Sequence, residues 1–226
     1  MTVGSSARAA LMGAAVVLGS NVLASSAWAD TMTFDLFASN MGAGFTGPFI
    51  EVTVNRTSDT TATITFDSLT NGGFTYLMHG NGAAAVNVNA ASFTGAVIST
   101  TNSLTGFGTP SGTFVNAKAE DGFGKFNAGV DLFDGFTHSA TEIQFSVTNT
   151  SGTWANVASV LTGNGDGNIA AAQIGACPVG CTGSSSFTAT GFAAVPTPTV
   201  GAGLPSVVLA CGGLLALARR RRQKVA

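Results

Sequence analysis

The chain has 226 residues, which is enough for one domain of ordinary size with short appendages. Five of its nine basic residues fall in the last eight positions. Residues 30–195 hold only three basic residues against all eleven acidic ones, a formal net charge of −8. An acidic body of this kind repels phosphate groups, so we do not expect nucleic acid among the partners.

The N-terminus has the three parts of a secretory signal peptide. Arg8 precedes an apolar run over residues 9–18, and the small residues Ala27 and Ala29 have the spacing of a signal-peptidase site. The alternative is a membrane-spanning helix, but the run is short for a hydrocarbon core about 30 Å thick and is interrupted by Gly and Ser. We therefore predict a signal peptide at 1–29, export through the Sec translocon and cleavage by signal peptidase after Ala29.

The cysteines agree with an exported protein. Cys177 and Cys181 bracket a Pro-Val-Gly sequence, and Cys211 lies alone in an apolar C-terminal segment. In an oxidising compartment the first two favour a disulfide that pins a small turn, with free thiols as the alternative. A metal site would need further ligands, and the nearest histidine, His138, is distant in the sequence. We predict a Cys177–Cys181 disulfide, whose short loop adds little chain-entropy stabilisation.

Residues 30–194 alternate apolar and polar side chains in several runs, most clearly at 50–55, 62–67 and 142–148. Period-two alternation buries one face of a strand and leaves the other in water. Asn-Gly, Gly-Gly and Asp-Gly pairs, which tolerate the positive φ of tight turns, separate such runs. They lie at 70–73, 81–82, 121–122 and 134–135. We predict an all-β domain, an antiparallel β-sandwich or jelly roll.

Aromatic residues supply much of the expected core. The core candidates are Phe66, Phe93, Phe126, Phe136 and Phe145. The segment 154–161 has apolar residues at helix-like spacing, so it forms either a short helix or a loop that closes over the sandwich.

From residue 195 onward the composition changes abruptly. The prolines of Pro196-Thr197-Pro198 fix φ and disfavour strand pairing. Residues 200–218 carry no charge and are long enough to cross a bilayer as a helix. Arg219, Arg220, Arg221 and Arg222 follow directly, and such a cluster stays on the cytoplasmic side. A buried core helix is not a satisfactory alternative, because four consecutive arginines could not follow it into a core.

Taken in this order, the Pro-x-Pro sequence, the apolar segment and the terminal Arg cluster resemble the PEP-CTERM sorting signal of Gram-negative bacteria. Residues 201–205 and 212–219 are similar to a recurring variant of that tail, and Thr197 stands where the family has Glu. The resemblance implies cleavage near the motif by an exosortase, after transient residence in the inner membrane. It also implies delivery to the cell surface or extracellular matrix, and a link to exopolysaccharide or biofilm. An unprocessed membrane anchor is the alternative that the same topology allows.

Groups suited to catalysis are few. His79 and His138 have no metal-ligand spacing, and no nucleophile motif accompanies Asp134, four residues before His138. We interpret the acidic pair Glu120-Asp121 as a solvated turn. The prediction is a structural or interaction protein with no catalytic residues. A carbohydrate-binding module or a carbohydrate-active enzyme on the same sandwich is the alternative.

One loop offers oxygen ligands for a cation. Asn164, Asp166 and Asn168 alternate with glycines, as at the start of a calcium loop, but no acidic residue follows within 169–176. We therefore favour a polar turn and keep calcium as the alternative. No other cofactor is expected.

Overall fold

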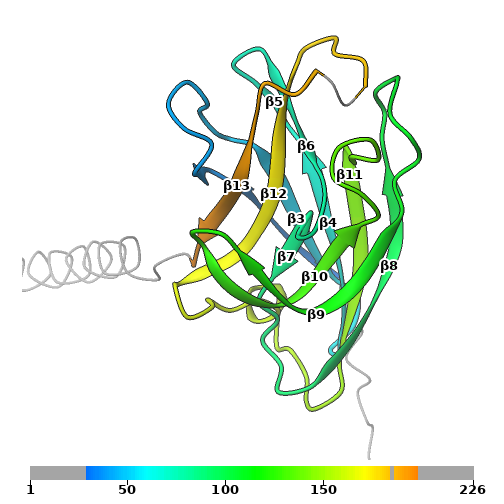
Figure 1. Cartoon of the computed structure of the whole chain (residues 1–226). Helices are drawn as coiled ribbons and strands as arrows, with labels where there is room; N and C mark the ends of the chain where they lie inside the picture. Colours follow the sequence, from blue (N-terminus) through cyan, green and yellow to red (C-terminus); the bar gives the residue numbers. More distant parts are fainter. Residues whose placement is uncertain (1–28, 184–185, 198–226) are drawn as a thin grey trace, which may run out of the picture.

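The computed structural model describes residues 29–183 and 186–197 (Figure 1). The described chain forms two antiparallel sheets in a β-sandwich-like fold, which confirms the predicted all-β class. The predicted signal peptide up to residue 28, the predicted span 200–218 and the Arg219–Arg222 cluster lie outside these residues. Within the described ranges, no helix is long and apolar enough to cross a membrane.

The first sheet has five strands and follows the predicted alternation. In spatial order they are β1 (Asp30–Leu36), β3 (Ile50–Arg56), β4 (Thr61–Ser68), β11 (Glu142–Asn149) and β8 (Phe93–Thr101). In β3, β4 and β11 every second side chain is buried, because one face of each strand packs on the core and the other faces solvent. These three strands contain the three alternating runs, which confirms that prediction.

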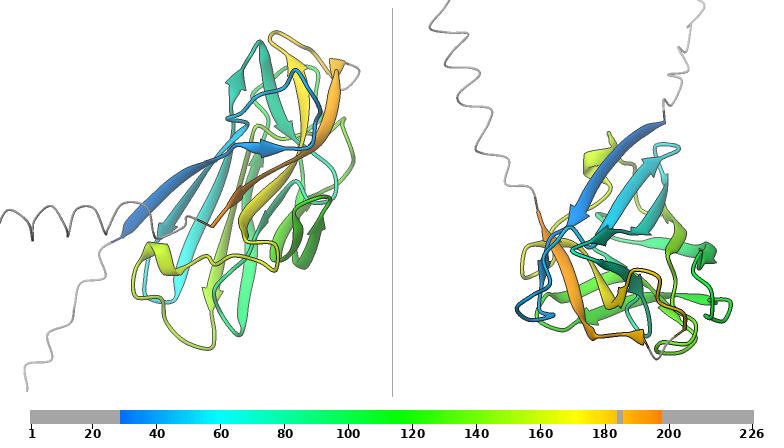
Figure 2. Two further views of the ribbon diagram at one scale, coloured as in Figure 1. Left: turned by 90° about the vertical axis from the view of Figure 1, so that its left-hand side faces the viewer. Right: turned by 90° about the horizontal axis from the view of Figure 1, so that it is seen from above.

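The second sheet has eight strands and is less regular. Its main path runs through β2 (Ala38–Ser39), β13 (Ala189–Pro196), β12 (Asn168–Pro178), β7 (Ala84–Val86), β10 (Gly124–Leu132) and β9 (Gly112–Glu120). The remaining strands, β6 (Phe74–Met78) and β5 (Thr70–Asn71), extend from β12. β12 is buried along almost its whole length, as expected of a strand covered on both faces. Strand β1, at the edge of the first sheet, contacts strand β13 of the second sheet, which lies beside the short edge strand β2 (Figure 2).

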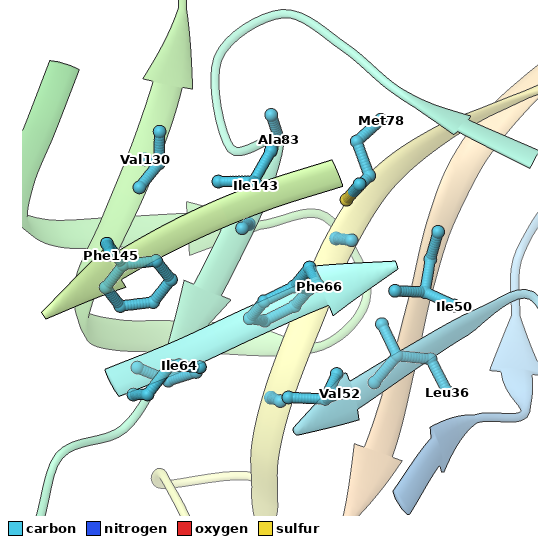
Figure 3. Close-up of a cluster of buried hydrophobic side chains, with 14 of the residues drawn as sticks. Leu36, Ile50, Val52, Ile64, Phe66, Met78, Ala83, Val130, Ile143 and Phe145 are labelled. Carbon is cyan, nitrogen blue, oxygen red and sulfur yellow. The ribbon is translucent and has the colours of Figure 1, made fainter. Parts of the chain in front are cut away.

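The main core lies between the two sheets (Figure 3). Ile64, Phe66 and Phe145 of the first sheet and Met78 and Val130 of the second are all fully buried in it. The rings of Phe66 and Phe145 stack with their centroids 6.2 Å apart. Burial of each such side chain contributes roughly 1.5–3 kcal/mol, so this cluster is the main source of stability.

The segment 154–161 is a loop with one short 3₁₀ turn, Val157–Ser159, so the loop alternative is confirmed. Trp154 is buried in the main core, and its Nε1 donates to the Asn89 carbonyl at 2.7 Å. Arg56 Nη1 donates to the Trp154 carbonyl at 3.2 Å. These contacts hold the loop over one end of the sandwich.

The face of the second sheet that points away from the main core is also buried. Ala84 and Ala170 belong to the main core, whereas their neighbours Ala85 and Ala171 point to the opposite face and are still fully buried. Ala85 and Ala171 pack there with Phe126 and with Ala194 of β13. Phe126 is therefore a core residue as predicted, but in this second, smaller cluster.

The β9–β10 hairpin provides the cover. Phe123, in its turn, packs against the second cluster, and Asn40 Nδ2, beyond β2, donates to the Asp121 carbonyl at 3.0 Å. The hairpin therefore reaches across the sheet to the far edge, and Figure 1 shows the long curve of β9. An irregularity at Ala117, whose φ is 79°, interrupts the β9–β10 ladder and accompanies this change of direction.

The predicted turns at 70–73, 81–82 and 121–122 are tight turns, and 134–135 is part of a longer bend. Gly82 and Gly122 have φ values of 90° and 80°, in the left-handed region that favours glycine. The Asn-Gly and Asp-Gly interpretation is therefore confirmed at these two turns.

Candidate functional site

Loops from several strands meet at one end of the second sheet. Gly80 N, after β6, donates to the Asp134 carbonyl at 3.2 Å, and Gly108 N, after β8, donates to the Thr137 carbonyl at 2.7 Å. Phe187, just before β13, completes the group by packing its ring against His79 at 5.8 Å between centroids. The topology thus brings four segments that are far apart in the sequence to one place.

His79 is the most unusual side chain in this region. It is 1% exposed and packs against the rings of Phe136 and Phe187, with centroid distances of 4.7 and 5.8 Å. Those two rings also contact each other, at 5.3 Å between centroids. Among the described residues neither ring nitrogen has a hydrogen-bond partner. Burial lowers the pKa of His79 to about 4, and the nearby backbone of Ile174 opposes this only in part. The ring is therefore neutral at pH 7.

A cavity of about 400 Å³ opens beside His79. It is lined by His79, Gly80, Asn81, Phe133, Asp134, Gly135, Phe136 and Gln173. With the Gln173 amide oriented to suit its neighbours, its nitrogen donates to the backbone carbonyls of Asn81 at 2.8 Å and His79 at 3.2 Å. These bonds tie the 79–82 loop to β12 and fix the inner wall of the cavity.

Asp134 and His138 form a hydrogen-bonded pair on the 133–141 loop. Asp134 Oδ2 lies 2.6 Å from His138 Nδ1, and Oδ1 accepts from the His138 backbone N–H at 2.9 Å. A hydrogen bond from the Thr137 hydroxyl, followed by those from His138, lowers the pKa of Asp134. No serine, threonine or cysteine among the described residues hydrogen-bonds to His138 Nε2. The pair therefore fastens the loop in this structure.

Two exposed phenylalanines border the cavity. Phe133 is 77% exposed, and its ring stands edge-on to His138 at 5.6 Å. Phe136 is 42% exposed, so the prediction that it belongs to the core is wrong. Phe136 lies in the 133–141 loop rather than on a strand, and it covers His79 instead of entering the space between the sheets. Phe66 and Phe145 are core residues as predicted, and Phe93 packs half-buried against the core.

A second cavity, of about 620 Å³, lies beneath the tip of the β9–β10 hairpin. Its lining includes Glu120, Lys125, Asp166 and Phe192. Glu120 is 2% exposed with both carboxyl oxygens unpartnered among the described residues, so the predicted solvated turn is wrong at this position. The turn of the hairpin begins only at Asp121, so Glu120 is still the last residue of strand β9 and is buried there.

Burial governs the charge of Glu120. Loss of solvation raises its pKa to about 9, and Asp131 adds to this effect while Lys118 opposes it. Lys118 Nζ instead pairs with Asp131 Oδ1 at 2.8 Å, and the same oxygen accepts from Gly82 N at 2.8 Å. Glu120 packs so closely against Gly82 that a side chain there would collide with its carboxyl group.

The loop considered for calcium also contacts the β9–β10 hairpin. Asn164 Oδ1 accepts the backbone N–H groups of Asp166 at 3.0 Å and Asn168 at 2.9 Å, which makes the polar turn that we favoured. The amide nitrogens of Asn164 and Asn168 donate to the Phe123 carbonyl at 2.9 and 3.1 Å. In the described part of the chain no three His, Cys, Asp or Glu side chains cluster closely enough to hold a metal ion.

The residues predicted to be processed lie at the ends of the described chain. Ala29 is exposed directly before β1, and Ala27 lies outside the described residues.

Pro196 ends β13 opposite Asn168, which departs from the expectation that this linker avoids strand pairing. A proline at the last position of a strand loses little ladder bonding. Thr197 donates to the Gly167 carbonyl from both its N–H at 2.6 Å and its Oγ1 at 2.9 Å, and Pro198 lies outside.

The structure joins Cys177 to Cys181 by a disulfide, with a Cα–Cα distance of 5.9 Å. Cys177 is fully buried near the end of β12, and Cys181 N donates to the Pro178 carbonyl at 2.8 Å. The bond closes the turn that leads from β12 toward the His79 cavity.

No protein-family model, curated protein or solved structure matches this chain. The resemblance of its tail to a sorting signal therefore stands on the tail residues themselves. The sequence drew attention to Asp134 and His138 through their spacing. It gave no sign of the burial of His79 and Glu120, because contacts distant in sequence cause both.

Proposed function

We propose that this protein is exported and delivered to the cell surface or extracellular matrix, where its β-sandwich serves a structural or interaction role. One observation carries the proposal. The first strand begins at Asp30, one residue after Ala29, and the last strand ends at Pro196, the first residue of the Pro-x-Pro sequence. The β-sandwich thus fills the interval between the two expected cleavage points.

The two boundaries are structurally firm, which supports the same proposal. Asp30 Oδ1 accepts from Arg56 Nε at 2.8 Å, and Oδ2 accepts from Val157 N at 2.8 Å. These bonds hold the first residue of β1 in place, and burial of Arg56 strengthens its pairing role. At the other end, Thr197 is fastened to Gly167. A chain cut before Asp30 and after Thr197 would lose no strand of the sandwich.

The proposal assigns the proteins that would export and process the chain to its two ends. A signal peptide with a cleavage site after Ala29 would engage the Sec translocon and signal peptidase. The span 200–218 and Arg219–Arg222 would hold the protein transiently in the inner membrane for an exosortase acting near Pro196-Thr197-Pro198. A matrix role linked to exopolysaccharide follows from the resemblance of the tail, and the proposal includes no catalytic step.

The test is the intact mass of the protein recovered from its native host, with surface, medium and membrane fractions measured separately. We expect surface or medium protein whose mass corresponds to a chain from Asp30 to a residue between Pro196 and Pro198. A membrane-bound form that retains Arg219–Arg222 would overturn the exosortase step and leave an unprocessed anchor. A form that retains residues 1–29 would overturn export by a cleaved signal peptide.

A pair of variants sharpens the test. Replacing all four residues of Arg219–Arg222 by serine removes the cytoplasmic cluster, and we expect this change to abolish the tail-cleaved form. Lys224→Ser changes one nearby charge and serves as the matched control, with processing unchanged. Normal processing of the four-serine variant would contradict the role proposed for the cluster.

A further inference from the structure

The His79 cavity has the size of a small-ligand site. Its volume of about 400 Å³ falls within the range of roughly 300–1,000 Å³ that is usual for such sites. Its walls come from three separated segments, the 79–82 loop, β12 and the 133–141 loop, and Gln173 ties the first two together. The cavity is therefore built by the fold rather than by one flexible loop.

The charges of the lining select an uncharged ligand. No lysine or arginine lines the cavity, so an anionic group would find no counter-charge. The one carboxylate, Asp134, already accepts hydrogen bonds from Thr137 and His138. His79 is neutral at pH 7 because of its burial. A charged ligand would lose its hydration without gaining a matching partner.

The polar groups select a ligand with hydroxyls. Neutral imidazole has one N–H donor and one lone pair. Neither nitrogen of His79 makes a hydrogen bond of good geometry among the described residues, and the looser approach of the Ile174 backbone can engage only one of them. Buried polar groups of this kind are normally hydrogen-bonded, and leaving them unpaired is unfavourable. A hydroxyl group both donates and accepts, so it complements either nitrogen. Asn81 adds an exposed amide at the rim.

The apolar groups select a ligand with an apolar face as well. Phe133 presents a largely exposed ring at the mouth, and Phe136 covers His79 with a ring that is 42% exposed. The negative face of an aromatic ring attracts the weakly positive C–H groups of a saturated ring. Phe136 must turn outward for a hydroxyl to reach His79, which its position on an exposed loop permits.

We propose that this cavity binds one neutral saccharide ring, with Phe133 against the apolar face of the ring and the ligand hydroxyls bonded to His79 and Asn81. A hydroxyl-rich ring with an apolar face meets all three requirements at once. The proposal rests on the cavity alone and holds whether or not the chain is sorted by its tail. The site also lies away from the tail: β13 runs from beside Phe187 to Pro196, toward the other end of the sheet (Figure 1).

The test begins with the full chain on an array of neutral and charged saccharides, followed by calorimetric titration of the best neutral binder. Phe133→Ala removes an exposed ring, and Phe37→Ala is its matched control, since Phe37 is 58% exposed and does not line the cavity. His79→Phe removes both nitrogens while keeping a ring packed against Phe136 and Phe187. Thermal melting of each variant checks that it folds.

We expect one saccharide bound per chain, an affinity lowered about tenfold or more by Phe133→Ala and by His79→Phe, and no more than a twofold change for Phe37→Ala. His79→Phe should keep or raise the melting temperature, so that its loss of binding is separate from stability. The proposal is overturned if no neutral saccharide binds. It is equally overturned if binding persists in both variants, or if only charged saccharides or peptides bind.

Discussion

The outer face of the first sheet carries half-exposed polar residues such as Glu51, Thr53 and Asn55, whereas the outer face of the second sheet is covered by its own β9–β10 hairpin. This difference in burial matters for the charge states of two titratable groups. Glu120 and His79 belong to the covered sheet, and burial raises the pKa of one to about 9 and lowers that of the other to about 4. Local sequence does not set these charge states. Glu120 is buried where the β9–β10 hairpin packs against Gly82, and His79 is buried by Phe136 and Phe187.

The core between the sheets gives the largest expected effect. Phe145→Ala should lower the free energy of unfolding by about 3–5 kcal/mol, because it removes a fully buried ring from the centre of the main cluster. Thr63→Ala, on the outer face of the neighbouring strand β4, should change it by less than about 0.5 kcal/mol. Urea unfolding measures both. Equal losses in the two variants would contradict the assignment of the two faces.

Glu120→Gln tests the covered face of the second sheet. The pKa of Glu120 is above its usual value, so between pH 4.5 and 9 the folded state binds more protons than the unfolded state, and stability falls as pH rises. The glutamine variant lacks this loss. Relative to wild type it should gain roughly 3 kcal/mol between pH 4 and pH 7, measured by denaturant unfolding. A difference that does not change with pH would refute the burial of Glu120.

His79→Phe should reveal the opposite slope. The pKa of His79 is below its usual 6.5, so between pH 6.5 and about 4 the unfolded state binds more protons, and stability is lost as pH falls. The phenylalanine variant should lose roughly 3 kcal/mol less than wild type between pH 7 and pH 4. Between pH 4.5 and 6.5 the two groups change the free energy of unfolding in opposite directions. A variant that removes one group therefore shows the pH dependence that the other group causes. Parallel pH profiles for wild type and His79→Phe would contradict this account.

The hairpin should loosen before the sandwich does. Asn164→Ala removes one donor to the Phe123 carbonyl and the acceptor that shapes the 164–168 turn, at a cost of about 1–2 kcal/mol. Amide hydrogen exchange should then quicken in residues 118–126 while β4 and β11 keep their protection. Uniform quickening across both sheets would mean that the hairpin is not a separate cover.

The smallest effect belongs to Ala117. Its φ of 79° is uncommon for a residue with a side chain, so Ala117→Gly should raise the free energy of unfolding by up to about 1 kcal/mol. Thermal melting detects a change of this size. Ala119→Gly, at an ordinary position on the same strand, is the control and should be destabilising.

The alternation in 50–55, 62–67 and 142–148 was enough to predict the centre of the first sheet, because one face of each strand is wet. The same approach gave little for β12, whose Ala- and Ile-rich run is buried on both faces and carries no period-two signal. Phe136 looked like a core residue because composition alone does not separate a strand from an exposed loop.

The candidate site was still less visible in the sequence. Asp134 and His138 attracted attention by a spacing of four, and the structure pairs them. His79 and Glu120 looked ordinary, since their partners Phe187, Gly82 and Asp131 come from other strands and loops. The β9–β10 hairpin forms most of the lining of the Glu120 cavity, whereas the 79–82 loop, β12 and the 133–141 loop form the His79 cavity.

The most direct test of the covered second sheet is an NMR titration of the purified protein, following the Glu120 side-chain carboxyl carbon and the His79 ring. We predict midpoints near pH 9 for Glu120 and near pH 4 for His79. Ordinary midpoints, about 4.3 for a glutamate and about 6.5 for a histidine, would mean that both groups are in water. An ordinary midpoint for Glu120 would contradict the burial of its carboxyl group at the β9–β10 hairpin, and an ordinary midpoint for His79 would contradict the neutral cavity beside that ring.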